Sequence, residues 1–243
     1  MKQNSSWGTS DWFSKKLKED GVTSPDGYFS YKKNAFQIMR IRAVLEFVKT
    51  HVSSKLRNPQ ILDIGSATGV LTSALKKMLE SENVKGIDFS QDLVNYANNL
   101  YGDIEFEKGA LPNLDFEDNS YDFLSLIEVL YYLPESERKK ALIECHRVLK
   151  KDGLMLFCSN ISRPPYLSSE EILSLFSSAR LEVITSSKLN FSSAIVLEGF
   201  LIRLRRFLKR LIFSTQDFFI IRISLGNVFK FFESITISIM GWG

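Results

Sequence analysis

The residues best suited to chemistry lie in two short segments of the chain. In Ile61-Leu-Asp-Ile-Gly-Ser-Ala-Thr-Gly69 an apolar run containing Asp63 ends in a glycine-rich turn, and in Val84-Lys-Gly-Ile-Asp88 a second run ends in an acid. Glycine lets the backbone turn sharply and approach a ligand without a Cβ in the way. A carboxylate at the end of a strand can accept hydrogen bonds from both hydroxyls of a ribose. The two segments together predict a pocket for a nucleotide cofactor.

A strand–helix–strand unit is needed to bring these residues together. The spacing from Asp63 to Asp88 suits one such unit, and its helix would direct unpaired N–H groups into the same space. The alternation continues along the chain, which predicts a parallel sheet with helices on both faces. We expect strands at about 60–64, 84–88, 104–107, 121–127, 153–159 and 181–188, and helices at about 70–80, 90–101, 135–149 and 168–179.

The two ends of the chain have different patterns. Residues 1–30 lack clear periodicity and predict an irregular arm with one helical turn near Trp12–Glu19. From Tyr31 apolar residues recur at intervals of three and four, which predicts a helix beside the first strand. Near the C-terminus, Ser234-Ile-Thr-Ile-Ser-Ile-Met240 alternates and is rich in β-branched residues, so we expect a strand there.

Three further segments extend the pattern in a fixed order. They are Phe106-Glu-Lys-Gly-Ala-Leu-Pro-Asn-Leu-Asp-Phe-Glu-Asp-Asn-Ser-Tyr-Asp122, Phe123-Leu-Ser-Leu-Ile-Glu-Val-Leu-Tyr-Tyr-Leu-Pro134 and Ala141-Leu-Ile-Glu-Cys-His-Arg-Val-Leu-Lys-Lys-Asp-Gly-Leu-Met-Leu-Phe157. With the first two segments they resemble the small-molecule class I S-adenosylmethionine-dependent methyltransferases over about residues 59 to 185. Several motifs in order are more specific than one glycine-rich turn.

The resemblance implies an α/β fold with a doubly wound, mostly parallel, seven-stranded Rossmann-like methyltransferase sheet whose last strand is antiparallel. From the residue patterns at the two ends of the chain we add a helical N-terminal arm and a C-terminal helical insertion that the minimal fold does not need. We therefore expect residues 1–243 to form a single methyltransferase domain. Its parts would be an arm and helix at 1–58, a cofactor-binding core at 59–190, a helical lid or insertion at 191–233 and a final strand at 234–243.

The implied cofactor is S-adenosyl-L-methionine. In this family Asp63 would orient the methionine ammonium group, Asp88 would bind the ribose and Phe89 would pack on the adenine. The full set of implied cofactor-binding residues is Asp63, Gly65, Ser66, Ala67, Gly69, Asp88, Phe89, Ala110 and Leu111.

Two positions depart from the family pattern. Ala67 stands where a glycine is usual, and Ala110 stands where an Asp or Glu often accepts the adenine amino group. Backbone atoms of Ala110 and Leu111 could still serve the adenine, at a cost of about 1–2 kcal/mol if one hydrogen bond is lost.

The candidate catalytic residues are Glu128 and Tyr131, which follow the strand expected at 121–127. If the methyl acceptor is a hydroxyl, a general base must lie within reach, and Glu128 is the nearest carboxylate. If the acceptor is an amine, these residues would only orient it. The alternative is that Glu128 pairs locally and the tyrosines form the pocket wall.

Several classes of site are disfavoured by the sequence. His51 and His146 have no metal-ligand spacing with another His, Cys or carboxylate, so we predict no metal site. Glu128-Val-Leu-Tyr131 stands where a base-flipping Asn-Pro-Pro-Tyr signature would follow the strand, which argues against a nucleic-acid substrate. The net charge of +3 is also local, because seven basic residues between Val196 and Glu233 face three acids.

That basic segment predicts an amphipathic helix at 197–213, with one apolar stripe and arginines and lysines elsewhere around it. It could be a lid over the substrate pocket, or it could bind a membrane surface or a lipid-like substrate. Because the N-terminus lacks the apolar core of a signal peptide, we expect a cytoplasmic protein, peripheral on the inner membrane surface if this helix binds lipid.

The predicted function is methyl transfer from S-adenosylmethionine to an oxygen or nitrogen atom of a small or amphiphilic acceptor. Two alternatives remain open from the residues. One is an NAD-dependent oxidoreductase, whose fingerprint also has a glycine-rich turn followed by an acid. The other is a non-catalytic methyltransferase-like module that docks on a membrane or partner through the basic helix. The sequence does not indicate the oligomeric state.

Overall fold

The computed structural model describes residues 8–20, 29, 35–160, 166–190 and 234–242. The predicted lid or insertion at 191–233, including the basic segment 197–213, lies outside these residues, so its helix and its membrane contact stay predictions. No helix within the described ranges is long and apolar enough to cross a membrane.

Seven strands form one sheet in the order β3-β2-β1-β4-β5-β7-β6. The strands are β1 (Ile61–Ile64), β2 (Val84–Asp88), β3 (Glu105–Lys108), β4 (Tyr121–Ile127), β5 (Leu149–Asn160), β6 (Leu181–Asn190) and β7 (Ser234–Trp242). Neighbours from β3 to β5 pair in parallel, whereas β7 is antiparallel to both β5 and β6. The predicted fold class, with an antiparallel last strand, is confirmed.

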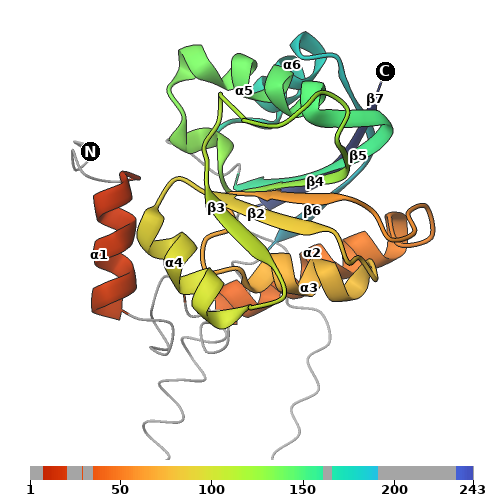
Figure 1. Ribbon diagram of the computed structural model, residues 1–243. Coiled ribbons are helices and arrows are strands. Elements are labelled where there is room, and N and C mark those ends of the chain that lie inside the picture. Colours follow the sequence, from red (N-terminus) through yellow and green to blue (C-terminus); the bar gives the residue numbers. More distant parts are fainter. Residues whose placement is uncertain (1–7, 21–28, 30–34, 161–165, 191–233, 243) are drawn as a thin grey trace, which may run out of the picture.

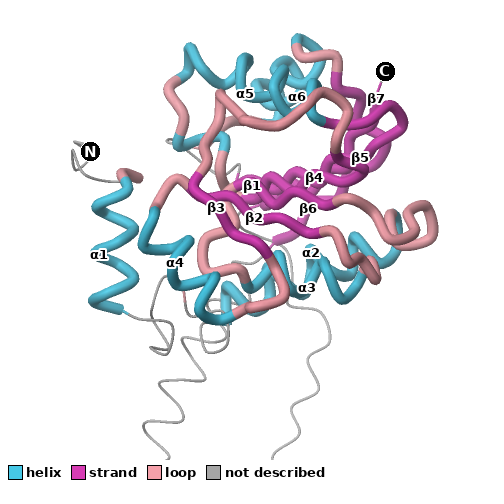
Figure 2. The backbone as a smooth tube through the Cα atoms, viewed as in Figure 1, coloured by secondary structure: helices cyan, strands magenta, loops and turns pink. Residues whose placement is uncertain are grey.

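Helices cover both faces of the sheet (Figures 1 and 2). One face carries α5 (Glu135–Val148) and α6 (Ser169–Ser178), and the other carries α2 (Ala35–His51), α3 (Val70–Met78) and α4 (Gln91–Leu100). Each strand contributes side chains to both faces, because successive side chains of a strand point to opposite sides of the sheet. Leu124 and Leu126 of β4 pack in the core under α5 and α6, and Phe123 packs in the core on the other side.

The N-terminal arm contains a complete helix, α1 (Ser10–Asp20), where the sequence predicted one helical turn. It lies beside α4 (Figure 1). The two helices are joined by a contact of 3.4 Å between the hydroxyls of Ser14 and Ser90 and by an ion pair of 3.3 Å between Lys18 and Asp92. Phe13 is buried in a small cluster with Phe29 and Leu93. The arm is therefore packed next to the carboxyl end of β2.

Candidate functional site

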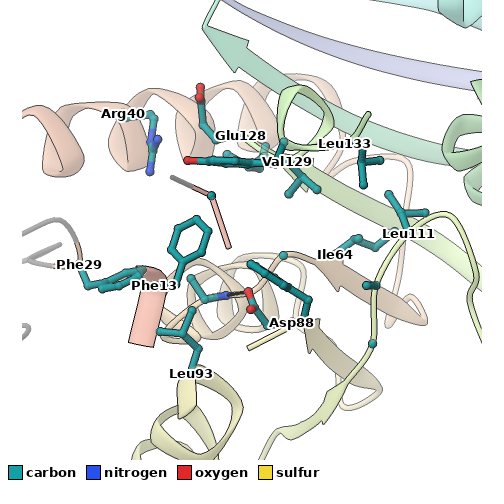
Figure 3. A pocket seen from close by; sticks show the side chains of 18 residues that line it. Phe13, Phe29, Arg40, Ile64, Asp88, Leu93, Leu111, Glu128, Val129 and Leu133 are labelled. Carbon is teal, nitrogen blue, oxygen red and sulfur yellow. Dashed lines mark hydrogen bonds between the residues drawn. The ribbon is translucent and has the colours of Figure 1, made fainter. Parts of the chain in front are cut away.

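A cavity of about 250 Å³ lies at the carboxyl ends of β1, β2 and β4, where ligands bind in open α/β folds. Seven of the eleven predicted site residues line it: Gly65, Ala67, Asp88, Phe89, Ala110, Leu111 and Glu128. In Figure 3, Arg40 and Glu128 lie on one side of the cavity and Asp88 and Leu93 on the other. Asp63 and Ser66 line a smaller adjoining cavity that shares Arg40, Gly65 and Ala67 with it.

The glycine-rich turn after β1 is tied closely to its neighbours. The backbone N–H groups of Gly65 and Ser66 both donate to the carbonyl of Ile87, at 2.8 and 2.9 Å. Gly65 has φ +78°, and a Cβ there would lie 2.4 Å from Cγ2 of Val129. The turn therefore requires glycine at position 65 for both its backbone angle and its space.

Gly69 begins helix α3 in the structure. It is the N-cap of α3 with φ +77°, and a Cβ there would lie 2.7 Å from the ring of Phe106. Gly69 lines neither of the two adjoining cavities. Its predicted contact with the cofactor stays a prediction, whereas its role in starting the helix follows from its geometry.

Asp88 ends β2 and is almost completely buried. One carboxylate oxygen accepts from the N–H of Ser90 at 2.9 Å and the other accepts from the N–H of Ala67 at 3.0 Å. Burial raises the pKa of Asp88 to about 6, against the lowering effect of these two hydrogen bonds. Each carboxylate oxygen still has a lone pair, so the group can accept further hydrogen bonds from a diol.

Asp63 lies within β1 and is also buried. It accepts hydrogen bonds from the hydroxyls of Thr72, at 2.5 Å, and of Ser125. Burial raises the pKa of Asp63 although both hydrogen bonds favour its ionised form. Its predicted contact with a ligand ammonium group stays a prediction.

Glu128 follows β4 in the left-handed region, with φ +59°. Its N–H donates to the carbonyl of Cys158 at 2.8 Å, and its Oε2 accepts from the hydroxyl of Tyr131 at 2.8 Å. Burial raises the pKa of Glu128, although the charge of Arg40, the Tyr131 hydroxyl and the backbone of Asn160 act in the opposite direction. A buried carboxylate with a raised pKa in a cavity has the properties of a general base.

Tyr131 does not line the cavity and is buried against the rings of Tyr132 and Tyr166. Its hydroxyl is linked to the cavity through Glu128. The structure thus brings both predicted catalytic residues together, with Tyr131 in a position to orient the carboxylate.

The sequence predicted that aromatic residues of the N-terminal arm, Phe29 among them, help to enclose the acceptor, but it did not single out Phe13 or Arg40. Phe13, Phe29 and Arg40 come from the arm and α2, and Tyr132 comes from η1 (Leu130–Tyr132) after β4. Phe13 contacts Phe89 and Tyr132, each at a ring-centroid distance of 5.4 Å. No local pattern marks Phe13 or Arg40, because their contact with the core depends on how the arm and α2 pack.

Comparison with known proteins shows what this chain resembles. Residues 61–153 match a family model described as a methyltransferase domain. A solved structure of the PH0226 protein from Pyrococcus horikoshii has the same fold, with a TM-score of 0.62 and 14% identity over 94% of this chain and 99% of that one. Residues 61–153 are therefore similar to a methyltransferase domain, and the described chain has the fold of that solved structure.

Relatives of this chain include two bacterial proteins. The chain is 38% identical over 102 residues to the ubiquinone/menaquinone biosynthesis C-methyltransferase of Campylobacter jejuni, which is 40% of this chain and 43% of that protein. It is 31% identical over 135 residues to a demethylmenaquinone methyltransferase of Staphylococcus epidermidis, covering 53% and 55% of the two chains. The match therefore spans about half of each relative.

The residues that line the cavity fit S-adenosylmethionine. Asp88 offers a buried carboxylate for the ribose, and the glycine at position 65 leaves the turn open to a ligand. In the described part of the chain, the hydroxyls of Ser66 and Thr68 are buried without a hydrogen-bond partner. Such orphaned polar atoms in a binding turn are consistent with a polar ligand.

Proposed function

We propose that the chain transfers the methyl group of S-adenosylmethionine to a small, mostly apolar acceptor whose reacting group is deprotonated by Glu128. The observation that carries this proposal is that Asp88 and Glu128 line opposite sides of one cavity. A nucleoside held at Asp88 and an acceptor held at Glu128 would then meet inside the same enclosed space. The cofactor supplies an electrophilic methyl group, so holding the two reactants together can provide much of the rate.

The cavity combines apolar walls with two charged groups for the acceptor, the carboxylate of Glu128 and the guanidinium of Arg40. Phe13, Phe29 and Tyr132 form an aromatic wall of the cavity that joins its two sides, which suits a small apolar or amphiphilic body. Glu128 takes the proton of an acceptor hydroxyl and becomes neutral, and the acceptor oxygen becomes an anion. The Arg40 guanidinium, in the same lining, can stabilise that anion until the methyl group is transferred.

The acceptor atom is the point at which the sequence and the relatives differ. The sequence favoured oxygen or nitrogen, whereas the Campylobacter relative is named a C-methyltransferase. The chemistry of Glu128 serves both outcomes. A deprotonated hydroxyl can be methylated at its oxygen, and on an aromatic ring it also makes the neighbouring ring carbon nucleophilic. We keep oxygen or nitrogen as the proposed acceptor atom, because Glu128 then acts directly on the reacting group.

Calorimetric titration with S-adenosylmethionine, S-adenosylhomocysteine and NAD is the first test of this proposal. Micromolar binding of the first two, without NAD binding, is the expected result. NAD binding alone would support the oxidoreductase hypothesis, and binding of none would leave the non-catalytic docking module. Methyl-labelled cofactor offered with a panel of phenols, amphiphilic alcohols and amines would then identify the acceptor. An NMR spectrum of the product that places the new methyl group on a carbon atom would overturn the assignment to oxygen or nitrogen.

A further inference from the structure

The loop between β3 and β4 is held at both of its ends. At its start, the N–H of Gly109 donates to the carbonyl of Asp88 at 3.1 Å, and residues 109–111 line the cavity. Its later part, residues 114–118, lies against α5, where Glu144 and Arg147 bind it.

Arg147 and Glu144 hold that later part through its backbone. Arg147 donates to the carbonyls of Leu114 and Phe116 at 3.0 and 2.7 Å, and to the carboxylate of Asp118 at 2.6 Å. Glu144 Oε1 accepts from the N–H of Leu114 at 3.0 Å. The two side chains also form a bidentate pair, with N···O distances of 2.6 and 2.9 Å. The paired guanidinium holds the pKa of Glu144 below its usual range, so the carboxylate stays ionised.

The position of this loop matters because Ala110 has no side-chain carboxylate that could bind the adenine amino group. A purine base is attached to the ribose, so a ribose at Asp88 puts the base against the lining residues nearest to Asp88. That described part of the lining includes Ala67, Phe89, Leu93 and residues 109–111, whose polar atoms are backbone atoms. A side-chain carboxylate can adjust by rotation, but a backbone group is aimed only by the loop that carries it.

We propose that Arg147 and Glu144 are positioning residues for the base of the cofactor. By fixing Leu114 and Phe116 on α5, they hold the backbone of Ala110 and Leu111 where it can hydrogen-bond the edge of the purine ring. This inference rests on the proposed function, because it assumes an adenine nucleoside in the cavity. It explains how the site can recognise adenine without an acid at position 110.

The test compares Arg147→Met with a matched control, Lys150→Met. Lys150 lies two residues past the end of α5 and forms a 2.9 Å ion pair with Asp122, outside the loop. Amide hydrogen exchange of residues 109–118 is measured without ligand. Calorimetry then gives the affinities of S-adenosylhomocysteine and of its deaminated analogue S-inosylhomocysteine, which differ only at the edge of the base. Turnover at saturating cofactor is measured where an acceptor is known.

In Arg147→Met we expect faster exchange in this loop, about tenfold weaker S-adenosylhomocysteine binding and a smaller preference over the inosyl analogue. Turnover at saturation should change by less than about twofold, because the acceptor side is untouched. Lys150→Met should behave as the unmodified chain. Arg147→Lys, which keeps the charge but loses the planar fork, should recover part of the affinity.

Unchanged exchange and affinity in Arg147→Met would overturn the inference, as would equal losses for both nucleosides with the preference intact. If Arg147→Met does not fold, Glu144→Gln makes a milder form of the comparison. Its amide oxygen can still accept from Leu114, but the charged pair that holds Arg147 is lost, so the same changes should appear in smaller size. Failure of the unmodified chain to bind S-adenosylhomocysteine would overturn the proposed function and the base-positioning role with it. The difference in amide exchange between Arg147→Met and Lys150→Met would still be seen if Arg147 holds the loop as described. The two failures are therefore distinguishable.

Discussion

The hydroxyl of Tyr131 donates to Oε2 of Glu128 at 2.8 Å, and through this contact a residue outside the cavity acts on the carboxylate within it. Hydrogen bonding favours the ionised carboxylate, whereas burial disfavours it. Glu128 also faces Arg40 from α2, Cys158 from β5 and the backbone of Asn160. Burial raises the pKa of the Cys158 thiol, which is therefore neutral, so Arg40, Tyr131 and the backbone of Asn160 are the groups that favour the ionised form of Glu128.

Glu128→Gln should reduce turnover at least about a hundredfold, the usual worth of a positioned general base. The amide keeps the size of the side chain and an acceptor for Tyr131, so the affinity for S-adenosylhomocysteine should change little. Turnover and calorimetry on the same preparation separate the two effects. Full turnover in this variant, with normal cofactor binding, would exclude Glu128 as the base.

Tyr131→Phe should move the pH profile of kcat/KM rather than lower it uniformly. Glu128 acts when ionised, so activity falls as the pH drops through its raised pKa. Removing the Tyr131 hydroxyl takes away a contact that lowers this pKa. The acidic limb should therefore shift to higher pH, with activity at high pH retained. An equal loss at every pH would indicate that Tyr131 only supports the local packing.

Cofactor affinity should fall as the pH is lowered through the pKa of Asp88, which is about 6. The ionised carboxylate accepts from the ribose hydroxyls, and protonation removes acceptor capacity. Between pH 7 and pH 5 the ionised fraction drops from most of the molecules to about a tenth, which predicts about tenfold weaker S-adenosylhomocysteine binding. Calorimetry at both pH values checks this. Asp88→Asn is the control, because it should bind weakly and equally at both.

Gly65→Ala should destabilise the fold by about 3 kcal/mol, through backbone strain at φ +78° and overlap with Val129. Val129→Ala in the same chain should relieve the overlap but not the strain. The double variant should therefore be more stable than the sum of the single losses predicts, by about 1–2 kcal/mol. Denaturant unfolding of all four chains measures this coupling. Strict additivity would show that the turn relaxes away from Val129.

The sequence was informative where function depends on local pattern. Strand ends are marked by apolar runs, so Asp88 and Glu128 could be assigned to the carboxyl edge of the sheet without a structure. Gly69 shows the limit of such reasoning, because the sequence pattern did not indicate that this glycine also starts helix α3. Arg40 was missed because helical periodicity separates polar from apolar faces and does not show which polar residue meets a cavity. The arm aromatics were expected to enclose the acceptor, but Phe13 was not singled out, because the packing of the arm depends on contacts distant in sequence.

The arm provides the remaining prediction, which concerns Phe13. Its ring is 6% exposed and contacts Phe89, Phe29 and Tyr132, so it links α1 to both sides of the cavity. Truncation to Ala should release α1 from α4 at a cost of about 3 kcal/mol in local stability.

We expect faster amide exchange across α1 and about tenfold weaker S-adenosylhomocysteine binding in Phe13→Ala, because the cavity loses one wall. Lys15→Ala on the exposed side of the same helix is the matched control, since Lys15 makes only a solvent-exposed 3.5 Å pair with Glu19 among the contacts described. Its exchange and affinity should match those of the unmodified chain. If Phe13→Ala loosens α1 but leaves the affinity unchanged, the arm encloses the acceptor alone and contributes nothing to holding the cofactor.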